Sequence, residues 1–504
     1  MATLEEEYDV VVVGGGLSGL SCAGRLAQQQ EGVRVLLLEA KDRVGGRVCP
    51  VKGVEGFPEN LEFDLGAEFV HGDGTVLHEI AREEDWKMRQ IFIWAHGDGG
   101  PAEEEAPDGG AGYYYDGMDR KLMRFDALDD DFEELSDALD KLGEDGAKFM
   151  EGESVEGSKM SEEERKTNLK QHLYSAGVSR RGIAMAEAGY ANTLGASLEH
   201  LSLGLTRRIE YLWDNDGGDV DFRIVPSTRL LLERLQRGLD AEHGVEIKKG
   251  CPVFKIELQG SSEADASALV QVEYFEGGEA RTVKARHVVV SVPVPILQGR
   301  IEGESINFVP QLPEDKRAAI DTLGVRGAMK VVARFSEKFW PEDMHGTVCS
   351  DSHIPEFWAH GAGALVDADS KPIEGEQAAA AASAEPCHIL VGFAMAGAAA
   401  NLATFKESQI LDMFVQQLDV IFGDKKASSS FLHGFVLDWS QEAYIRGGYS
   451  FPSIHEHTSS RGIVARSEFN GRLHFCGEAT DATESYMTMH SAMRTGIRAA
   501  NEIL

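Results

Sequence analysis

The chain has 504 residues, of which 42% are apolar and 26% are charged, values typical of a folded globular protein rather than a disordered or fibrous one. This length predicts about two domains of roughly 200 residues each. The 49 Lys and Arg against 84 Asp and Glu give a formal net charge of -35, which repels phosphate backbones and anionic lipids, so we expect neither a nucleic-acid nor a membrane partner.

The first fifty residues carry the pattern of a βαβ unit. Val, Ile and Leu runs bounded by glycine predict buried strands at Tyr8 to Val13 and at Val33 to Glu39, with a helix from Leu17 to Gln30 between them. Such a unit predicts a parallel sheet of the α/β class.

Three glycines follow the first strand and open the helix. Gly14 allows a tight turn, Gly16 lets the backbone approach a pyrophosphate, and Gly19 lets helix pack on strand. The helix N-terminus offers unpaired N–H groups to the phosphates. Glu39 ends the second strand, where a carboxylate accepts hydrogen bonds from ribose hydroxyls. These features together predict a dinucleotide site.

The segment Arg43-Val44-Gly45-Gly46-Arg47 adds two guanidinium groups and two flexible backbone N–H groups for the same pyrophosphate. A double-glycine arginine segment after the ribose carboxylate is a feature of flavoproteins rather than of nicotinamide dehydrogenases. The predicted cofactor is therefore FAD.

The rest of the chain contains neither a repeat nor a heptad array. Composition predicts surface insertions at Gly97 to Gly112 and Glu374 to Pro386, and exposed acidic amphipathic helices from Asp126 to Glu164. Periodicity predicts two further buried strands, at Arg286 to Val294 and Leu473 to Gly477, and a last helix from His490 to Leu504.

The ends and the cysteines indicate a cytoplasmic protein. The acidic start and the glycines that interrupt the first apolar run predict no signal peptide and no membrane helix, and the last residues carry no SKL-type peroxisomal signal. Six scattered cysteines without a CxxC pair predict reduced thiols, and we expect no metal.

Several segments resemble the flavin-containing amine oxidase family, and within it the polyamine oxidase branch. They occur in the family's order over nearly the whole chain: GGGLSGL, EAKDRVGGR, DLGAEFVHG (Asp64 to Gly72), KVVARFSEKFWP (Lys330 to Pro341), DWSQEAYIRGGYSF (Asp438 to Phe451) and LHFCGEAT (Leu473 to Thr480). The resemblance implies a Rossmann-like FAD-binding domain of the GR2 type, with residues 1–75, 226–300 and 436–504, and an interleaved α+β substrate-binding domain, with residues 76–225 and 301–435.

The resemblance also implies which residues bind the cofactor. Val253 resembles a valine that contacts adenine, and Gly477 with Glu478 the pair at the ribityl and phosphate end. The implied FAD-binding residues are Gly14, Gly16, Ser18, Gly19, Glu39, Ala40, Arg43, Gly45, Gly46, Arg47, Gly66, Ala67, Glu68, Phe69, Val253, Trp439, Gly477, Glu478, Thr488 and Met489.

The residues that the resemblance places at the reaction are Lys330, Trp439, Tyr449, Glu68 and His71. Lys330 stands where the family holds a water against flavin N5, and Trp439 and Tyr449 stand where aromatic rings position the amine. Glu68 and His71 match polar positions near the amine entrance, where an anion suits a second ammonium group. The second wall of the aromatic cage stays open between Tyr486 and Thr488.

The implied activity is oxidation of a polyamine or related cationic amine, with hydride transfer to FAD and electrons passed to O₂ to give an aldehyde, an amine and hydrogen peroxide. The segment from Asp64 to Gly72 lacks the arginine with which L-amino acid oxidases bind the substrate carboxylate, which disfavours an α-amino acid substrate. No cysteine lies between Asp438 and Phe475, the region where monoamine oxidases attach the flavin, so we expect non-covalent FAD. We expect a monomer or homodimer. Alternatives are an L-amino acid or monoamine oxidase, a flavin-dependent desaturase or isomerase, a scaffold without turnover and, less favoured, a chromatin demethylase.

Overall fold

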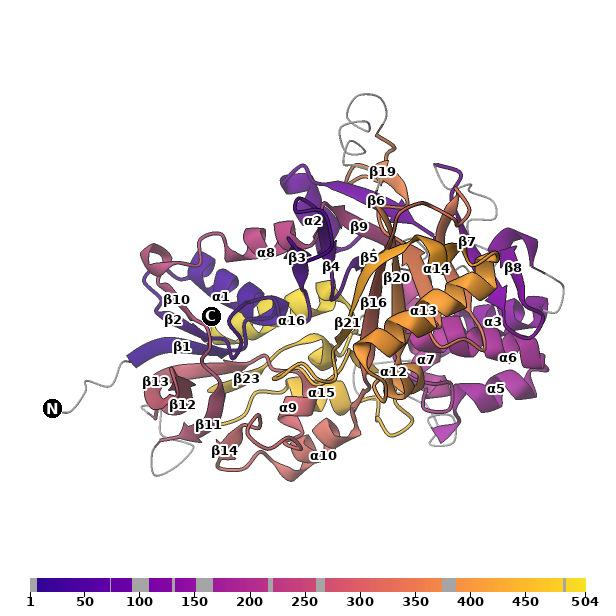
Figure 1. The fold of residues 1–504 in the computed structure, drawn as a ribbon. Coiled ribbons are helices and arrows are strands. Elements are labelled where there is room, and N and C mark those ends of the chain that lie inside the picture. Colours follow the sequence, from indigo (N-terminus) through magenta and orange to yellow (C-terminus); the bar gives the residue numbers. More distant parts are fainter. Residues whose placement is uncertain are drawn as a thin grey trace.

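The computed structural model describes residues 7–72, 74–92, 108–128, 132–150, 166–215, 221–259, 268–373, 387–483 and 486–504. Within these ranges the fold is mixed α/β, with two large sheets (Figure 1). One sheet lies at the left of the view, and the strands of the other lie at the centre and right.

The first sheet is built around the predicted βαβ unit. Its strands follow the order β10-β2-β1-β13-β12-β11-β14, and β23 pairs with the end of β13. Parallel strands that are buried on both faces need continuous apolar runs, and β1 and β2 have them. The strands are β1 (Glu7–Val13), β2 (Val35–Leu38), β10 (Val245–Lys248), β11 (Val253–Leu258), β12 (Val270–Glu276), β13 (Glu279–Val290), β14 (Asn307–Val309) and β23 (Leu473–Phe475).

Four parallel strands of this sheet end at one edge. Val13 is in register with Leu38 on β2 and with Val290 on β13, and Val290 is in register with Phe475 on β23. Ligands of open α/β sheets bind outside the carboxyl ends of such strands. The residues that follow these ends, Gly14, Glu39, Ser291 and Cys476, all line one cavity.

The helix α1 (Leu17–Gln29) packs against the last helix, α16 (Met489–Ile503). A Cβ atom added at Gly496 would lie 2.1 Å from the Ser18 carbonyl oxygen, so only glycine permits this approach. The contact places the N-terminus of α16 beside the glycine turn. Further helices near this sheet are α2 (Val76–Glu83), α8 (Arg229–Gln236), α9 (Val294–Leu297), α10 (Glu314–Thr322) and α15 (Ser460–Ala465).

Replacing Gly496 by alanine is expected to destabilise the protein by about 1–3 kcal/mol, because the new methyl group must push α16 away from α1. The measurement is the thermal unfolding midpoint together with the fraction of protein purified with flavin. The matched control is Gly24→Ala in α1, where the added Cβ would lie 3.9 Å from Leu239 and alanine favours the helix. Equal midpoints for the two variants would contradict the expectation.

The second large sheet has the order β21-β16-β20-β18-β17-β7-β8. Met329 and Val331 of β16 pack in an apolar cluster with Phe414 of α13, while Lys330 of the same strand lines the cavity on the opposite face. The strands of this second sheet are β7 (Ala111–Asp116), β8 (Lys121–Arg124), β16 (Ala328–Phe335), β17 (Met344–Cys349), β18 (Glu356–Ala359), β20 (His388–Met395) and β21 (Phe431–Asp438). The helices that cover it are α12 (Ala396–Leu402), α13 (Glu407–Phe422) and α14 (Lys426–Ser430).

A smaller sheet with the order β19-β6-β9-β5 carries further cavity residues. Its register sets His71 opposite Asp221 and Phe69 opposite Arg223. Its strands are β5 (Phe69–His71), β6 (Lys87–Ile91), β9 (Asp221–Val225) and β19 (Ala364–Val366); β3 (Pro50–Lys52) pairs with β4 (Glu62–Asp64), and β15 (Gly324–Val325) with β22 (Ser450–Phe451).

Among the described residues, the helices α3, α5, α6 and α7 pack together and lie at the right of Figure 1. The acidic region from Asp126 to Glu164, expected to form exposed amphipathic helices, contributes α3, whose Leu135, Leu139 and Leu142 are buried in contact with other helices. Residues 129–131 and 151–164 of that region lie outside the described residues. The helices are α3 (Glu133–Met150), α5 (Leu169–Ser175), α6 (Arg180–Ala186) and α7 (Leu203–Asn215).

The expected strand from Arg286 to Val294 differs from the structure. The strand β13 begins earlier than expected, at Glu279. It ends at Val290, because the prolines at 293 and 295 have no N–H to donate to a neighbouring strand and instead suit the first turn of α9. Of the expected insertions, residues 97–107 and 374–386 lie outside the described residues, and residues 111–112 begin β7.

The predicted domain limits stay a prediction, and several strands cross them. The strand β14 joins the first sheet although it lies beyond residue 300, and β5 joins the smaller sheet although it precedes residue 75. All six cysteines are free thiols. Among the described residues, no helix combines the length and apolarity needed to cross a membrane.

Candidate active site

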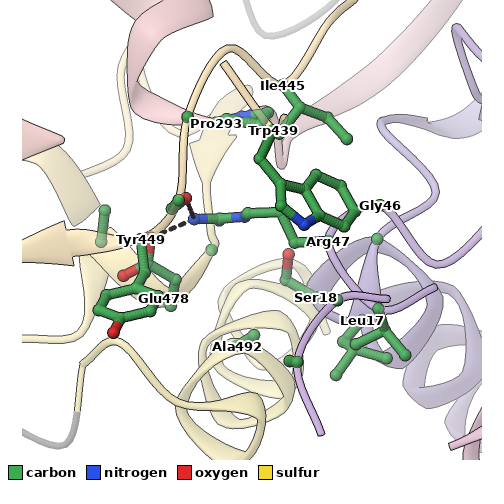
Figure 2. A pocket seen from close by; sticks show the side chains of 18 of the residues that line it. Leu17, Ser18, Gly46, Arg47, Pro293, Trp439, Ile445, Tyr449, Glu478 and Ala492 are labelled. Carbon is green, nitrogen blue, oxygen red and sulfur yellow. Dashed lines mark hydrogen bonds and ion pairs between the residues drawn. The ribbon is translucent and has the colours of Figure 1, made fainter. Parts of the chain in front are cut away.

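A cavity of about 370 Å³ extends from the glycine turn after β1 to the cavity-facing side of the second sheet. It is lined by residues from both large sheets and from α1 and α16. Figure 2 shows part of it, with Leu17 and Ser18 of α1 and Ala492 of α16 near Trp439, Arg47 and Glu478.

The glycine turn and Glu39 form one end of the cavity. The Glu39 carboxylate accepts hydrogen bonds from the backbone N–H groups of Gly15 (2.6 Å) and Lys41 (2.8 Å). A Cβ added at Gly19 would lie 2.0 Å from the Gly14 carbonyl oxygen, so Gly19 serves helix packing and does not line the cavity. Gly16 has no atom within 4 Å of an added Cβ, which leaves the N-terminus of α1 open to a ligand.

The two predicted pyrophosphate arginines differ in position. The Arg43 guanidinium donates to the carbonyls of Gly46 (2.9 Å) and Val48 (3.1 Å), so it holds the loop and does not line the cavity. Arg47 lines the cavity and donates to the Gly448 carbonyl and to Glu478, both at 2.8 Å (Figure 2). Burial alone would raise the pKa of Glu478, but Arg47 and other partners lower it overall, so this carboxylate stays ionised.

The aromatic residues Trp439 and Tyr449 both line the cavity. Trp439 donates its ring N–H to the Leu65 carbonyl (3.1 Å), and the Tyr449 hydroxyl donates to the Thr193 carbonyl (2.5 Å). These bonds orient two rings that sequence reasoning could place only by resemblance.

The two residues left open for the second wall of the cage differ in position. Tyr486 is buried with its ring 3.3 Å from the Arg461 guanidinium carbon and does not line the cavity, whereas Thr488 does. Thr488 also caps α16 by accepting a hydrogen bond from the N–H of Ser491. Tyr486 therefore does not contribute to the cavity lining, and the identity of the second wall stays a prediction.

Lys330 is buried in the cavity wall. Its ammonium donates to the carbonyls of Asp64 and Gly66, both at 2.9 Å, and to the carboxylate of Glu68 at 2.8 Å. Glu68 is also ion-paired with Arg223, and although burial raises the pKa of Glu68, these two cations lower it overall. Glu68 is thus already paired, so it does not offer the free anion that we expected for a second ammonium group.

His71 lines the cavity and contacts Asp221 through Nδ1 at 2.6 Å. Burial lowers the pKa of His71, but the carboxylate of Asp221 more than offsets this, so the pKa is raised overall. The two residues form a polar pair in the part of the cavity that also contains Glu356.

Glu356 is a cavity residue that sequence reasoning missed. Its carboxyl accepts hydrogen bonds from Asn192 and Thr193, both at 3.0 Å. It lies in register with Phe393 on β20, which is in register with Lys330 on β16, so Glu356 and Lys330 are two strand spacings apart, about 10 Å. Burial raises the pKa of Glu356 to about 8. The only hint in the sequence is a lone carboxylate in the apolar segment Ile354 to Ala359.

Replacing Glu356 by glutamine is expected to stabilise the protein increasingly as pH rises. The folded-state pKa lies above that of an unfolded glutamate, so the wild-type protein loses stability from about pH 4.5 to about pH 8, as the unfolded chain ionises first. We expect little difference at pH 5 and a gain of about 2–4 kcal/mol at pH 9, measured from thermal unfolding midpoints without amine. The control is the exposed Glu302→Gln, and an equal gain at both pH values would contradict the expectation.

The comparisons with known proteins agree with this geometry. A family model described as flavin containing amine oxidoreductase matches residues 17–504. The chain belongs to this family. The description of this family names a flavin and amine oxidoreductase chemistry.

The chain is similar to curated proteins with two kinds of name. It is 25% identical to lysine-specific histone demethylase 2 of Homo sapiens over 98% of this chain and 53% of that protein. It is 26% identical to amine oxidase [flavin-containing] B of Sus scrofa over 99% of this chain and 87% of that protein. The chain thus spans about half the length of the demethylases that it matches.

Solved amine oxidases share the fold. Cyclohexylamine oxidase from Brevibacterium oxydans superposes with a TM-score of 0.74 at 20% identity, covering 98% of both chains. Wild-type putrescine oxidase bound to putrescine superposes with a TM-score of 0.73 at 18% identity, covering 99% of both chains.

The residues that line the cavity fit a flavin dinucleotide. One cavity joins an open helix N-terminus and a buried carboxylate, Glu39, to a buried ammonium, Lys330, and two aromatic rings. The helix N-terminus suits a pyrophosphate and Glu39 suits ribose hydroxyls. The other predicted cofactor residues that line the cavity are Gly14, Gly16, Ser18, Ala40, Gly45, Gly46, Arg47, Gly66, Ala67, Glu68, Phe69, Val253, Trp439, Gly477, Glu478, Thr488 and Met489.

Proposed function

We propose that this protein is an FAD-dependent amine oxidase whose substrate carries a second cationic nitrogen, as diamines and polyamines do. The observation that carries the proposal is the buried carboxyl of Glu356, which lies in the cavity wall about 10 Å from Lys330. When bound, FAD would accept the hydride from the amine α-carbon; water would then hydrolyse the imine, so that amine, O₂ and water give aldehyde, amine and hydrogen peroxide.

The cavity suits a cationic amine at its wall. Trp439 and Tyr449 offer ring faces that attract an ammonium group and hold the carbon next to it. Phe393 lies between Lys330 and Glu356 in the sheet register, so an alkyl chain that joins two nitrogens would pack on an apolar side chain. A carboxylate substrate would meet Glu356 and Asp221 instead, which disfavours L-amino acids.

Glu356 also links binding to proton release. Its pKa of about 8 keeps much of the carboxyl protonated at pH 7, and an ammonium placed against it favours the ionised form. Binding of a diamine at pH 7 should therefore release a proton to solvent, which a monoamine of equal length would not cause.

We further propose that FAD is held without a covalent bond. Cys476 and Cys251 line the cavity, but burial raises the pKa of Cys476 to about 12 and also raises that of Cys251. A thiol in its protonated form is a poor nucleophile. A monomeric or dimeric state and a cytoplasmic location remain predictions.

The deciding experiment is anaerobic mixing of the flavin-loaded protein with putrescine, spermidine, spermine, N-acetylated polyamines, monoamines, L-amino acids and a methyl-lysine histone peptide, following the loss of flavin absorbance. We expect diamines or polyamines to reduce the flavin fastest. Glu356→Gln should raise KM for the best diamine about 10- to 100-fold and leave that of the matched monoamine unchanged.

Other outcomes would assign another function. Reduction only by L-amino acids or only by the histone peptide would overturn the proposed substrate class. Absence of reduction by every amine, with peroxide absent as well, would favour a desaturase, an isomerase or a flavin-binding scaffold.

A further inference from the structure

The turn from Asn192 to Gly195 holds the carboxyl of Glu356. It follows directly on the π-helix Glu187–Ala191, an irregular helical form that is often found at functional sites. The backbone N–H of Gly195 donates to the Asn192 carbonyl at 3.0 Å, which closes the turn. Asn192 Nδ2 lies 3.0 Å from Oε2 of Glu356, and Thr193 Oγ1 lies 3.0 Å from Oε1. Each oxygen of the carboxyl therefore has one hydrogen-bond partner from this turn.

Asn192 can only donate to Glu356. Its Oδ1 accepts a hydrogen bond from the backbone N–H of Met395 at 2.8 Å. A backbone N–H cannot accept a hydrogen bond, so this contact fixes which end of the amide faces Met395. The NH₂ group must therefore face Oε2 of Glu356, and that oxygen has to accept. Both side chains are buried, so the loss of either bond would leave a polar group without a partner.

Thr193 can serve either form of the carboxyl. A hydroxyl is both a donor and an acceptor, and it turns about its C–O bond. Because Oε2 must accept from Asn192, the proton of a neutral Glu356 is placed on Oε1, where Thr193 Oγ1 accepts it. When the carboxyl ionises, the same hydroxyl turns and donates to Oε1. Thr193 lines the cavity together with Glu356, so this change takes place at the proposed cation site.

Three further titratable groups lie near Glu356. Asp221 on β9 raises the pKa of Glu356 by its negative charge and is itself hydrogen-bonded to His71. Burial and the charge of Glu356 raise the pKa of the Tyr449 hydroxyl and that of the Cys349 thiol on β17, so both groups stay neutral. Among the described residues, no cation pairs with Glu356, and its two hydrogen bonds are those with the turn.

We propose that Asn192 and Thr193 are positioning residues for Glu356, in which Asn192 is a permanent donor and the Thr193 hydroxyl changes from acceptor to donor when the carboxyl ionises. The inference rests on the proposed function only for the event that causes ionisation, which is the arrival of an ammonium group. The proton of the carboxyl then passes to solvent, and the ammonium becomes its charge partner. Because the hydroxyl can turn, neither form of Glu356 loses its hydrogen bond at Oε1.

The test follows the protonated carboxyl of Glu356 directly, by infrared absorption of the flavin-loaded protein without amine. The C=O band of the protonated carboxyl is assigned to Glu356 by its loss in Glu356→Gln. Its decrease with rising pH gives a titration midpoint, which we expect at about pH 8 in the wild-type protein. Since no substrate is needed, this result does not depend on whether any amine is oxidised.

Thr193→Val keeps the shape of the side chain and removes the hydroxyl. We expect the midpoint to rise by about one pH unit, because the ionised carboxylate loses a charge-assisted hydrogen bond, which is stronger than the bond lost by the neutral form. Thr193→Ser should restore the wild-type midpoint. The matched control is Thr206→Val, at a buried threonine of α7 whose hydroxyl donates to the Ser202 carbonyl, and it should leave the midpoint unchanged.

Two results of this titration would overturn the proposal. One is a wild-type midpoint in Thr193→Val, since the hydroxyl would then not favour the ionised form. The other is a shift in Thr193→Ser as large as that in Thr193→Val, since the shift would then follow from altered packing and not from the loss of a hydroxyl.

Asn192→Asp gives an independent test if Thr193→Val folds poorly. An aspartate keeps an acceptor for the Met395 N–H but replaces the donor to Glu356 by a second acceptor. The two carboxyls must then share a proton, so the last proton of the pair should be released about one pH unit or more above the wild-type midpoint. Loss of the band at or below the wild-type midpoint would show that Asn192 does not donate to Glu356 and would overturn the proposal.

A diamine substrate gives a readout at the cation site itself. With the best diamine, Thr193→Val should raise KM about tenfold at pH 7 and leave kcat unchanged, because Glu356 is harder to ionise. The KM of the matched monoamine should not change. If no amine reduces the flavin, the proposed function fails while the infrared result still decides the roles of Asn192 and Thr193. An unchanged diamine KM in a variant whose midpoint has shifted would overturn the coupling of this hydroxyl to amine binding.

Discussion

Lys330→Met is expected to slow oxidation of the reduced flavin by O₂ by about 100- to 1,000-fold, the range found when one preorganised charge or donor is removed from a reacting site. The variant should still purify with yellow flavin, because Lys330 lies in the wall of the second sheet while the dinucleotide residues lie at the edge of the first. Methionine is close to lysine in volume, so packing on Trp358 is largely kept. The measurement is the second-order rate constant for reoxidation.

A second buried lysine offers a matched control for Lys330→Met. Lys316 has no exposed side-chain surface, donates to the carbonyls of Ile463 and Arg466, and does not line the cavity. Burial lowers the pKa of Lys316 to about 8. Lys316→Met should lower the thermal midpoint and leave the reoxidation rate unchanged. Near-normal reoxidation of Lys330→Met, or equal slowing in both variants, would refute a specific role of Lys330.

The first sheet and its ligand edge could be predicted because their determinants are local. The apolar runs of β1 and β2, the glycines between them and Glu39 lie within about forty residues, so periodicity and spacing suffice to place them together. The boundaries were less accurate, as β13 shows, because a strand's start depends on the partner it finds, here β12.

The far side of the cavity could not be predicted in the same way. Lys330 meets Glu68 across 262 residues of chain, and its neighbour Glu356 is placed only by the register of three strands. A resemblance can name Lys330 but cannot show that its ammonium is paired with Glu68. It also cannot show that Arg43 bonds to its own loop while Arg47 reaches Glu478, because both depend on rotamers.

Glu39→Ala is expected to weaken FAD binding about 100- to 1,000-fold, which corresponds to about 3–4 kcal/mol. The carboxylate lines the cavity at the end of β2, where it suits ribose hydroxyls. It also fixes the turn, since it accepts from the N–H groups of Gly15 and Lys41. Alanine removes the ribose acceptor and leaves these two donors unpaired, each at a cost of about 1–3 kcal/mol. The measurement is the dissociation constant of FAD from the apoprotein, read from flavin fluorescence.

A variant at a carboxylate on the neighbouring strand serves as a control, because it shows whether the loss of FAD affinity in Glu39→Ala is specific or follows from a general loss of stability. Glu246 on β10 accepts a hydrogen bond from the Tyr8 hydroxyl at 2.6 Å and does not line the cavity. Glu246→Ala should therefore bind FAD like the wild-type protein. The FAD affinity of Glu39→Gln should lie between those of the wild-type protein and Glu39→Ala. The glutamine side chain has one oxygen that can accept and one NH₂ group that cannot, so only one of the two backbone N–H groups keeps its acceptor. Wild-type affinity in Glu39→Ala would show that the flavin is held by the helix N-terminus and the arginine segment without this carboxylate.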